Sequence, residues 1–251
     1  MTKLADQEAR VTVLCSGNGS NLQAIIDGCE SGGLPGVFIV KVITNRKAAF
    51  AAQRAERAGI PTEYFNLVND GFHVAGEKDA AKLREARAEY DDALGQKVLL
   101  DKPDLVVLAG WMHVFSPSFL KHLDAAKVPI INLHPALPGE CSLSPGRPWA
   151  GNVAIFLLRG VVGRYNGANA IKRAYDDFQA GKLEQGRTGV MIHYCIAEVD
   201  MGSPILIEEI ECREGESLEQ LEDRIHAVEH VLIVKATGLV AKKILDRKKQ
   251  T

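Results

Sequence analysis

Short apolar segments alternate with helix-forming segments through the first half of the chain. Four helices are expected, beginning near residues 22, 47, 77 and 116, and each follows a segment that is typical of a buried strand. The predicted strands cover 11–15, 37–44, 62–65, 104–109 and 128–133. This alternating order predicts an α/β fold with a mostly parallel, Rossmann-like sheet and helices on both of its faces.

The second half of the chain changes character. Segments 188–196 and 205–210 have the pattern of strands, and the connection between them is too short for a helical crossover. They are therefore expected to pair antiparallel and to extend the sheet in the C-terminal half. A terminal helix is expected over 217–240, because Ser217 and Gln220 have the spacing of a capping box. The whole chain, 1–251, is predicted to form a single domain.

Composition narrows the range of partners. The net charge is -2, which gives no electrostatic reason to expect nucleic acid or an anionic membrane. No apolar run reaches the roughly 18 residues that span a bilayer, and the polar start at 1–10 is unlike a signal peptide. The five cysteines include no C-x-x-C pair, so we expect reduced thiols, no metal site and a cytoplasmic protein.

A glycine-containing loop, 16–21 (Ser-Gly-Asn-Gly-Ser-Asn), follows the first predicted strand and precedes a helix. Glycines allow close approach of the backbone, and a helix start presents N–H groups to an anion. The dinucleotide fingerprint fails, because Leu22 stands where its third glycine belongs. We therefore predict that this loop binds a terminal phosphate monoester. The simpler alternative is a tight turn in which Ser20 or Asn21 caps the helix.

Asn132 and His134 end the fifth predicted strand, immediately before Pro135. Alternation along a strand puts both side chains on one face, at the carboxyl end where open α/β sheets bind ligands. Asp200 lies in a polar loop after the sixth predicted strand, where its carboxylate would orient His134 and raise its pKa. These residues are predicted to be catalytic. The alternative is that the histidine is structural and that Asp200 only forms a turn.

Four stretches occur in the order and spacing of one enzyme family. They are 16–23 (SGNGSNLQ), 109–112 (AGWM), 132–137 (NLHPAL) and 198–202 (EVDMG). In these residues the chain resembles the phosphoribosylglycinamide formyltransferases, which belong to the formyltetrahydrofolate-dependent formyltransferase superfamily. The resemblance covers nearly the whole chain, apart from 141–164 and some loop length around 71–95.

The resemblance implies an enzyme of de novo purine (IMP) biosynthesis. Its members transfer a formyl group from the co-substrate 10-formyltetrahydrofolate to the amine of 5′-phosphoribosylglycinamide (GAR), without a metal. The expected partners are small molecules only, with no nucleic acid and no membrane, and the expected assembly is a monomer or a weak homodimer. Residues 1–110 would form the phosphate-binding half, and residues 111–251 the folate-binding and catalytic half.

The resemblance also implies roles for residues. The catalytic positions are Asn132, His134 and Asp200, with His193 in support. The positions for substrate phosphate and ribose are Gly17, Asn18, Gly19, Ser20, Asn21 and Glu229. The positions for folate are Met112, His113, Val114, Ile196, Ala197, Glu198 and Val199. Two residues depart from the family's pattern, because His113 replaces an arginine and His226 replaces a lysine.

Residues 141–164 do not fit the family's spacing. Removing them would leave an ordinary short loop before 165–170 (YNGANA). Gly139-Glu140-Cys141 can be encoded with the intron start GTGAGT, and Val162-Gly163 with a matching AG end. We therefore hypothesise that 141–164 is a translated intron. The alternative is a genuine insertion beside the site.

Three other functions are weighed against this one. The chain resembles other formyltetrahydrofolate enzymes in its Asn-His-Asp set, but a tRNA formyltransferase is expected to carry an extra C-terminal domain and the hydrolase an extra N-terminal one. A phosphometabolite-binding protein, catalytically impaired by the insert, is an alternative of another class. A nicotinamide-dependent oxidoreductase is disfavoured by Leu22 and by Asn45, which stands where an acid would bind a ribose diol.

Overall fold

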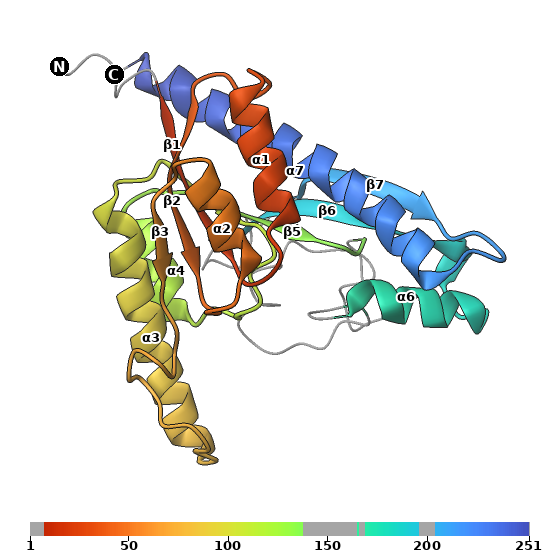
Figure 1. Cartoon of the computed structure of the whole chain (residues 1–251), viewed down its shortest axis with the longest axis horizontal. Coiled ribbons are helices and arrows are strands. Elements are labelled where there is room, and N and C mark those ends of the chain that lie inside the picture. Colours follow the sequence, from red (N-terminus) through yellow and green to blue (C-terminus); the bar gives the residue numbers. More distant parts are fainter. Residues whose placement is uncertain (1–7, 138–164, 166–168, 196–203, 251) are drawn as a thin grey trace.

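The computed structural model describes residues 8–137, 165, 169–195 and 204–250. A seven-stranded sheet with the order β3-β2-β1-β4-β5-β6-β7 forms its centre (Figure 1). The strands are β1 (Ala9–Cys15), β2 (Val37–Thr44), β3 (Thr62–Tyr64), β4 (Leu105–Leu108), β5 (Ile130–His134), β6 (Arg187–Cys195) and β7 (Pro204–Glu211). Strands β1 to β5 pair in parallel, and β6 and β7 pair antiparallel. The predicted α/β class, with a mostly parallel sheet and an antiparallel extension, is confirmed.

Helices cover both faces of the sheet. On one face lie α1 (Ser20–Glu30), α2 (Phe50–Arg57) and α7 (Leu218–Lys248), and on the other lie α3 (Ala80–Leu100) and α4 (Pro117–Ala125). Each face has its own apolar core. Successive side chains of a strand point to opposite faces, so Val13 lies in the core under α1, α2 and α7, and Leu14 lies in the core under α3 and α4. A strand buried on both faces needs a continuous apolar run, and all four residues of β4 are buried.

A smaller helix, α6 (Ala170–Gln179), packs beside the start of α7 (Figure 1). Its core consists of Ala136, Tyr165, Ala170, Ala174 and Leu183. Ala136 comes shortly after β5 in the chain. This small cluster therefore connects the end of β5 to the segment that carries α6.

The strand order places β1 beside β4 although β2 and β3 separate them in the chain. Here the connections turn to opposite sides, which in open α/β sheets creates a ligand crevice at the carboxyl ends of the strands. Two hydrogen bonds tie the loops that follow these strands. The Met112 N–H donates to Ser16 Oγ at 2.8 Å, and the Ser16 N–H donates to the Gly110 carbonyl at 3.1 Å. The glycine loop and the loop after β4 therefore lie side by side.

The clearest differences from prediction concern three helices. Helix α2 begins at Phe50 instead of residue 47, because a turn closed by the Ala49 N–H and the Arg46 carbonyl precedes it. Helix α7 ends at Lys248 instead of residue 240, where Lys248 Nζ contacts Asp104 Oδ2 at 2.7 Å. Helix α6 was not predicted. The predicted insert at 141–164 lies outside the described residues.

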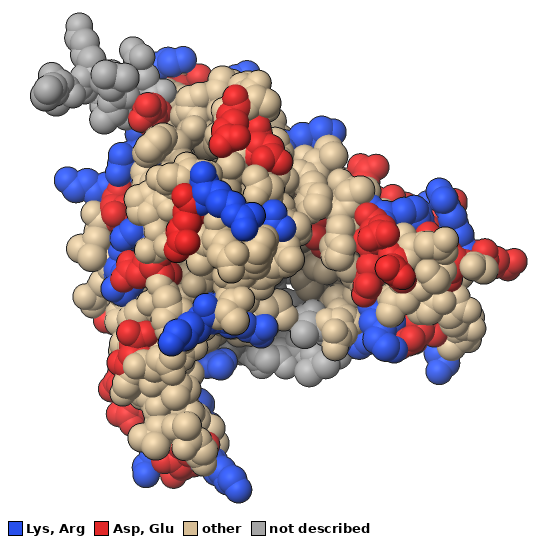
Figure 2. Space-filling model, viewed as in Figure 1, with Lys and Arg blue, Asp and Glu red and all other residues tan. Residues whose placement is uncertain are grey.

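On the face shown in Figure 2, basic and acidic side chains are interspersed, and neither sign forms a continuous surface. This distribution agrees with the small net charge of -2. In the described part of the chain, none of the helices combines the length and apolar character of a membrane-spanning segment.

Candidate active site

Asn132 and His193 meet at the point where β5 and β6 pair. They are partners in the antiparallel register, and Asn132 Nδ2 lies 3.2 Å from His193 Nε2. His193 Nδ1 lies 3.0 Å from the Tyr194 carbonyl, which only accepts, so the proton of the neutral ring is on Nδ1. Nε2 then accepts from the Asn132 amide. His193 therefore fixes the direction in which the amide of Asn132 faces.

His134 lies two residues beyond Asn132 on the same strand, in register with Met191. Burial lowers the pKa of His134 to about 4, and the charges of His193 and Arg173 act in the same direction. A hydrogen bond with the Tyr165 backbone opposes them. Burial likewise lowers the pKa of His193 to about 4. With only the described residues around them, both imidazoles are therefore neutral near pH 7.

The acid predicted to act with these residues, Asp200, lies outside the described residues. So do the predicted folate-loop positions Ile196, Ala197, Glu198 and Val199. The structure therefore brings together Asn132, His134 and the supporting residue His193, and their assignment as catalytic residues stays a prediction.

The glycine loop passes directly into α1 without a side-chain cap. The N-cap is Gly19, with φ 76°, and Ser20 and Asn21 are already inside the helix. In the alternative of a tight turn capped by Ser20 or Asn21, the assignment of the cap is therefore wrong. Gly17 and Asn18 are exposed, and a Cβ at Gly17 would meet no atom within 4 Å. The loop thus presents accessible backbone beside a helix start, where anions bind favourably.

Two buried polar side chains connect this loop to α7. Asn21 Nδ2 donates to Glu229 Oε2 at 3.0 Å, and both residues are buried. Burial raises the pKa of Glu229, while the bond from Asn21 and the charge of His226 oppose that rise. The predicted phosphate and ribose positions, which are far apart in the sequence, therefore converge at one place.

The loop after β4 shows an alternation that the sequence did not reveal. Met112 and Val114 are 44% and 40% exposed, whereas the His113 side chain is buried and lies 2.6 Å from Asp91 Oδ1 on α3. Asp91 also accepts from the Ser116 N–H. His113 therefore anchors the loop to α3, while Met112 and Val114 face outward. Asp91 was missed, because its position in a charged helix gives no signal that it is buried.

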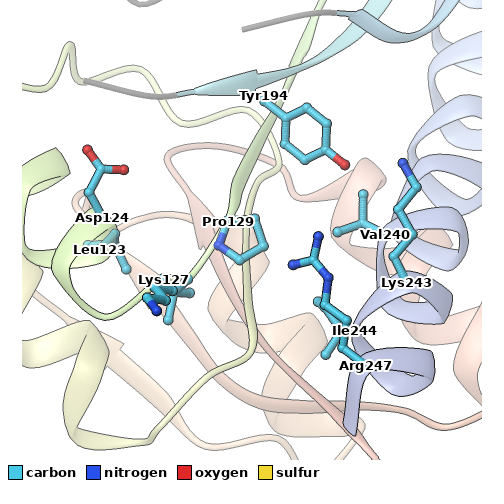
Figure 3. Close-up of a pocket in the computed structure, with 10 residues that line it drawn as sticks. Leu123, Asp124, Lys127, Pro129, Tyr194, Val240, Lys243, Ile244 and Arg247 are labelled. Atoms are coloured by element: carbon cyan, nitrogen blue, oxygen red, sulfur yellow. The ribbon is translucent and has the colours of Figure 1, made fainter. Parts of the chain in front are cut away.

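A pocket of about 260 Å³ lies away from these residues, near the start of β5. Figure 3 shows Tyr194, Lys243 and Arg247 around it, facing Pro129 and the end of α4. Because Asn132 and His134 are at the other end of β5, this pocket is separate from the candidate active site. Within the ranges described above, no cluster of three or more His, Cys, Asp or Glu side chains is suited to a metal ion.

Comparisons with known proteins identify the family. The sequence model of the formyl transferase family matches residues 9–142 and 157–237. The interruption, 143–156, lies within the segment that departs from the family's spacing.

Several individual proteins match over nearly their full length. A phosphoribosylglycinamide formyltransferase of Schizosaccharomyces pombe is 41% identical and aligns with 91% of this chain and 95% of its own length. One of Dictyostelium discoideum is 37% identical, with 93% and 98% covered. The crystal structure of glycinamide ribonucleotide transformylase 1 from Geobacillus kaustophilus is 27% identical with a TM-score of 0.67, covering 93% of this chain and 99% of that one. The chain therefore belongs to the formyl transferase family, among the phosphoribosylglycinamide formyltransferases.

Proposed function

We propose that the chain transfers a formyl group from 10-formyltetrahydrofolate to the amine of GAR, giving formylglycinamide ribonucleotide in de novo purine biosynthesis. The observation that carries the proposal is the meeting of Asn132, His134 and His193 at the carboxyl end of β5, in a chain of this family. The glycine loop lies at the same edge of the sheet, after β1.

The reaction needs a stabiliser for negative charge and a path for one proton. The amine of GAR attacks the formyl carbon, and the formyl oxygen becomes an oxyanion. The Asn132 amide and a protonated His134 would donate to it, which is worth about 3 kcal/mol per donor in comparable acyl transfers. Collapse then breaks the bond to N10 of the folate, and the proton lost by the amine moves to that nitrogen.

A protonated His134 requires a partner, because its described surroundings hold its pKa at about 4. We assign that role to Asp200. An ionised carboxylate within about 4–6 Å raises the pKa of an imidazole. In this proposal the same carboxylate also passes the amine proton onward, directly or through water. His134 is thus protonated before the attack. It then stabilises the oxyanion, and the proton of the amine is transferred last.

Binding of the two substrates is divided between the two halves of the chain. The GAR phosphate binds at Gly17, Asn18, Gly19, Ser20 and Asn21, where the start of α1 favours an anion. Glu229 binds the ribose. The folate lies against Met112, Val114 and the loop 196–199. Holding both reactants in line supplies much of the acceleration, because a bimolecular step becomes effectively unimolecular.

The direct test follows the absorbance change of the folate during formyl transfer to GAR. Replacing Asp200→Asn removes the charge that sustains a protonated His134, so we expect kcat to fall by at least about 100-fold, with the KM for GAR nearly unchanged. Asp176→Asn is the matched control, since Asp176 is an exposed acid on α6 and, among the described residues, its carboxylate pairs with Lys172. Full turnover in Asp200→Asn would show that the assigned role of the carboxylate is wrong.

A second candidate function rests on the interruption of the family match at 143–156. If this segment disturbs the neighbouring site, the chain would bind GAR without transferring the formyl group. Calorimetric binding of GAR with no absorbance change of the folate would favour this candidate. Neither candidate requires a macromolecular partner, and we expect a monomer or weak homodimer in the cytoplasm.

A further inference from the structure

Helix α2 holds the glycine loop through Arg54. Arg54 Nε donates to the Asn18 carbonyl at 3.0 Å, and Nη2 donates to Asn18 Oδ1 at 2.8 Å. Nη1 donates to Gln23 Oε1, in the first turns of α1, at 3.2 Å. One guanidinium thus binds the backbone and side chain of one loop residue and the helix that follows.

The loop backbone is held on the other side of Asn18 as well. The Ala51 N–H donates to the Gly17 carbonyl at 3.3 Å. At Gly19, a Cβ would lie only 2.7 Å from Ala51 Cβ, so the loop touches α2 without space between them. Two consecutive carbonyls, those of Gly17 and Asn18, therefore point toward α2.

These contacts determine the direction of two N–H groups. In a trans peptide the N–H points opposite to the carbonyl of the same peptide unit. Since the Gly17 and Asn18 carbonyls face α2, the Asn18 and Gly19 N–H groups face away from it. Successive N–H groups on one side of a loop form an anion-binding concavity.

Arg54 is itself positioned by its neighbours. Its guanidinium carbon lies 4.9 Å from the centre of the Phe50 ring. Its charge also reaches α7, where burial and the charges of His226 and Arg54 lower the pKa of His230. Arg54 therefore adds positive potential between the glycine loop and the part of α7 that carries Glu229.

We propose that Arg54 is a positioning residue for the substrate phosphate: it holds Asn18 so that the N–H groups of Asn18 and Gly19 face the phosphate. This inference rests on the proposed function, in which the loop binds the phosphate of GAR. Arg54 acts through the loop, so its loss weakens binding of the phosphate-bearing substrate and leaves the chemical step intact.

Arg57 supplies a matched control. It lies on the same helix and its guanidinium carbon is 5.3 Å from the same Phe50 ring, but among the described contacts it makes no hydrogen bond to the loop. Arg54→Gln is expected to raise the KM for GAR about tenfold, as for a lost hydrogen bond to a charged group. The kcat and the KM for folate stay within about twofold, and Arg57→Gln leaves all three unchanged. Arg54→Lys falls between, because an ammonium cannot replace the two-pronged contact.

An unchanged KM for GAR in Arg54→Gln, or an equal rise in Arg57→Gln, would overturn the inference. A double-mutant cycle with Asn18→Ala gives an independent measurement, because the two effects must be less than additive if Arg54 acts through Asn18. If Arg54→Gln does not fold, Arg54→Lys takes its place both in the KM measurement and in the cycle with Asn18→Ala.

A binding measurement separates failure of this inference from failure of the proposed function. If the unaltered chain transfers no formyl group, calorimetric titration with ribose 5-phosphate tests Arg54 alone. Weaker binding by Arg54→Gln than by Arg57→Gln supports the inference. Equal binding by the two variants, or no binding by the unaltered chain, contradicts it.

Discussion

Gly17 and Gly19 stand two positions apart in one loop, but their surroundings differ. Gly19 has φ 76° and touches α2, whereas a Cβ at Gly17 would meet nothing within 4 Å. The sequence predicted a loop at 16–21 whose glycines allow close approach of the backbone. It did not predict which glycine is sterically required, because the constraint comes from Ala51, which is distant in the chain.

Gly19→Ala is therefore expected to destabilise the fold by about 1–3 kcal/mol, from backbone strain and overlap with Ala51. Gly17→Ala is the matched control and should change the free energy of unfolding by less than about 0.5 kcal/mol. Urea unfolding of the two variants checks this. Equal effects would mean that contact with α2 does not constrain the loop.

Buried imidazoles give the protein a pH dependence of known sign. Burial lowers the pKa of His193 to about 4 from its ordinary value of 6.5, so the unfolded chain binds the proton more tightly. The stabilising contribution is complete above pH 6.5 and is lost as the pH falls toward 4. His193→Gln should make the decline in unfolding free energy between pH 7 and pH 4 shallower, by up to about 3 kcal/mol. An unaltered slope would show that His193 does not titrate in this way.

At the scale of single residues, the prediction was best where the chemistry is local. Alternation along one strand predicted that Asn132 and His134 lie on the same face of the sheet. The contacts of His113 with Asp91, and of Asn21 with Glu229, join different helices and loops. No local pattern encodes such a contact, so the structure was needed to find it.

Secondary-structure elements were predicted well where their ends carry a chemical signal. The capping box at Ser217 and Gln220 is present at the start of α7. The end of α7 was wrong by eight residues, because the helix continues to Lys248, whose contact with Asp104 joins segments that are distant in the chain. Helix α6 was missed because it follows the anomalous segment, where the pattern of the surrounding chain is lost.

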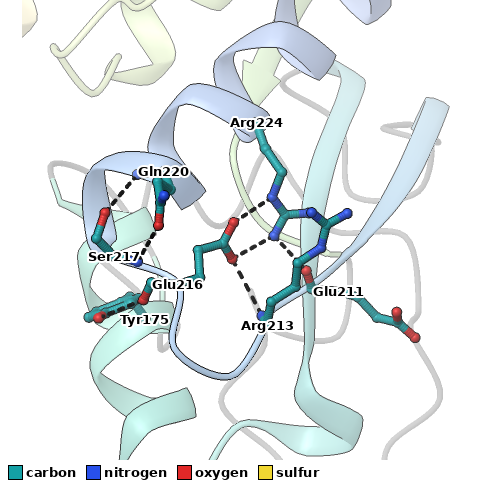
Figure 4. Close-up of polar contacts among 7 residues, drawn as sticks. All are labelled: Tyr175, Glu211, Arg213, Glu216, Ser217, Gln220 and Arg224. Atoms are coloured by element: carbon teal, nitrogen blue, oxygen red, sulfur yellow. Dashed lines mark hydrogen bonds and ion pairs between the residues drawn. The ribbon is translucent and has the colours of Figure 1, made fainter.

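An ion pair stabilises the start of α7, and no sequence pattern predicted it. Arg224 Nε and Nη2 contact the two carboxylate oxygens of Glu216 at 2.6 Å and 2.7 Å, and the Tyr175 hydroxyl donates to the Glu216 carbonyl (Figure 4). Arg224 Nη2 also donates to the Glu211 carbonyl at the end of β7. This pair therefore joins α7, β7 and α6.

Glu216→Gln is expected to lower the free energy of unfolding by roughly 1–2 kcal/mol, because a charge-assisted, two-pronged contact is lost. The Arg224 contact lowers the pKa of Glu216, so its contribution is present above the ordinary glutamate pKa and disappears in acid. Asp176→Asn, in an exposed pair with Lys172, should cost less than about 0.5 kcal/mol. Equal losses in urea unfolding at pH 7 would contradict this account.

For the molecule as a whole, the fold class was predictable but the strand order was not. Alternating strands and helices indicate a parallel sheet, whereas the position of β1 beside β4 depends on pairing between distant segments. That order is what brings the glycine loop beside Met112. The expected identity of the substrates came from the resemblance to a family, because no physical pattern in the chain identifies them.

The segment 141–164 stands between β5 and α6 in the chain. We propose that it is a translated intron. Its deletion should preserve the fold and raise the kcat for formyl transfer to GAR by at least about tenfold, since the number of residues between β5 and α6 then returns to the family's spacing. Messenger RNA that mostly retains these codons would rule out the intron, and a deletion variant without higher activity would show that the segment does not impair the site.

The central claim is that this chain places one formyl group on the amine of GAR. Mass spectrometry of a reaction containing GAR and 10-formyltetrahydrofolate tests it most directly, with the unaltered chain and the deletion variant in parallel. The account predicts a ribonucleotide heavier by one CO unit, formed in equal amount with deformylated folate. Folate deformylated without any change in GAR, or no product with either form of the chain, would contradict it.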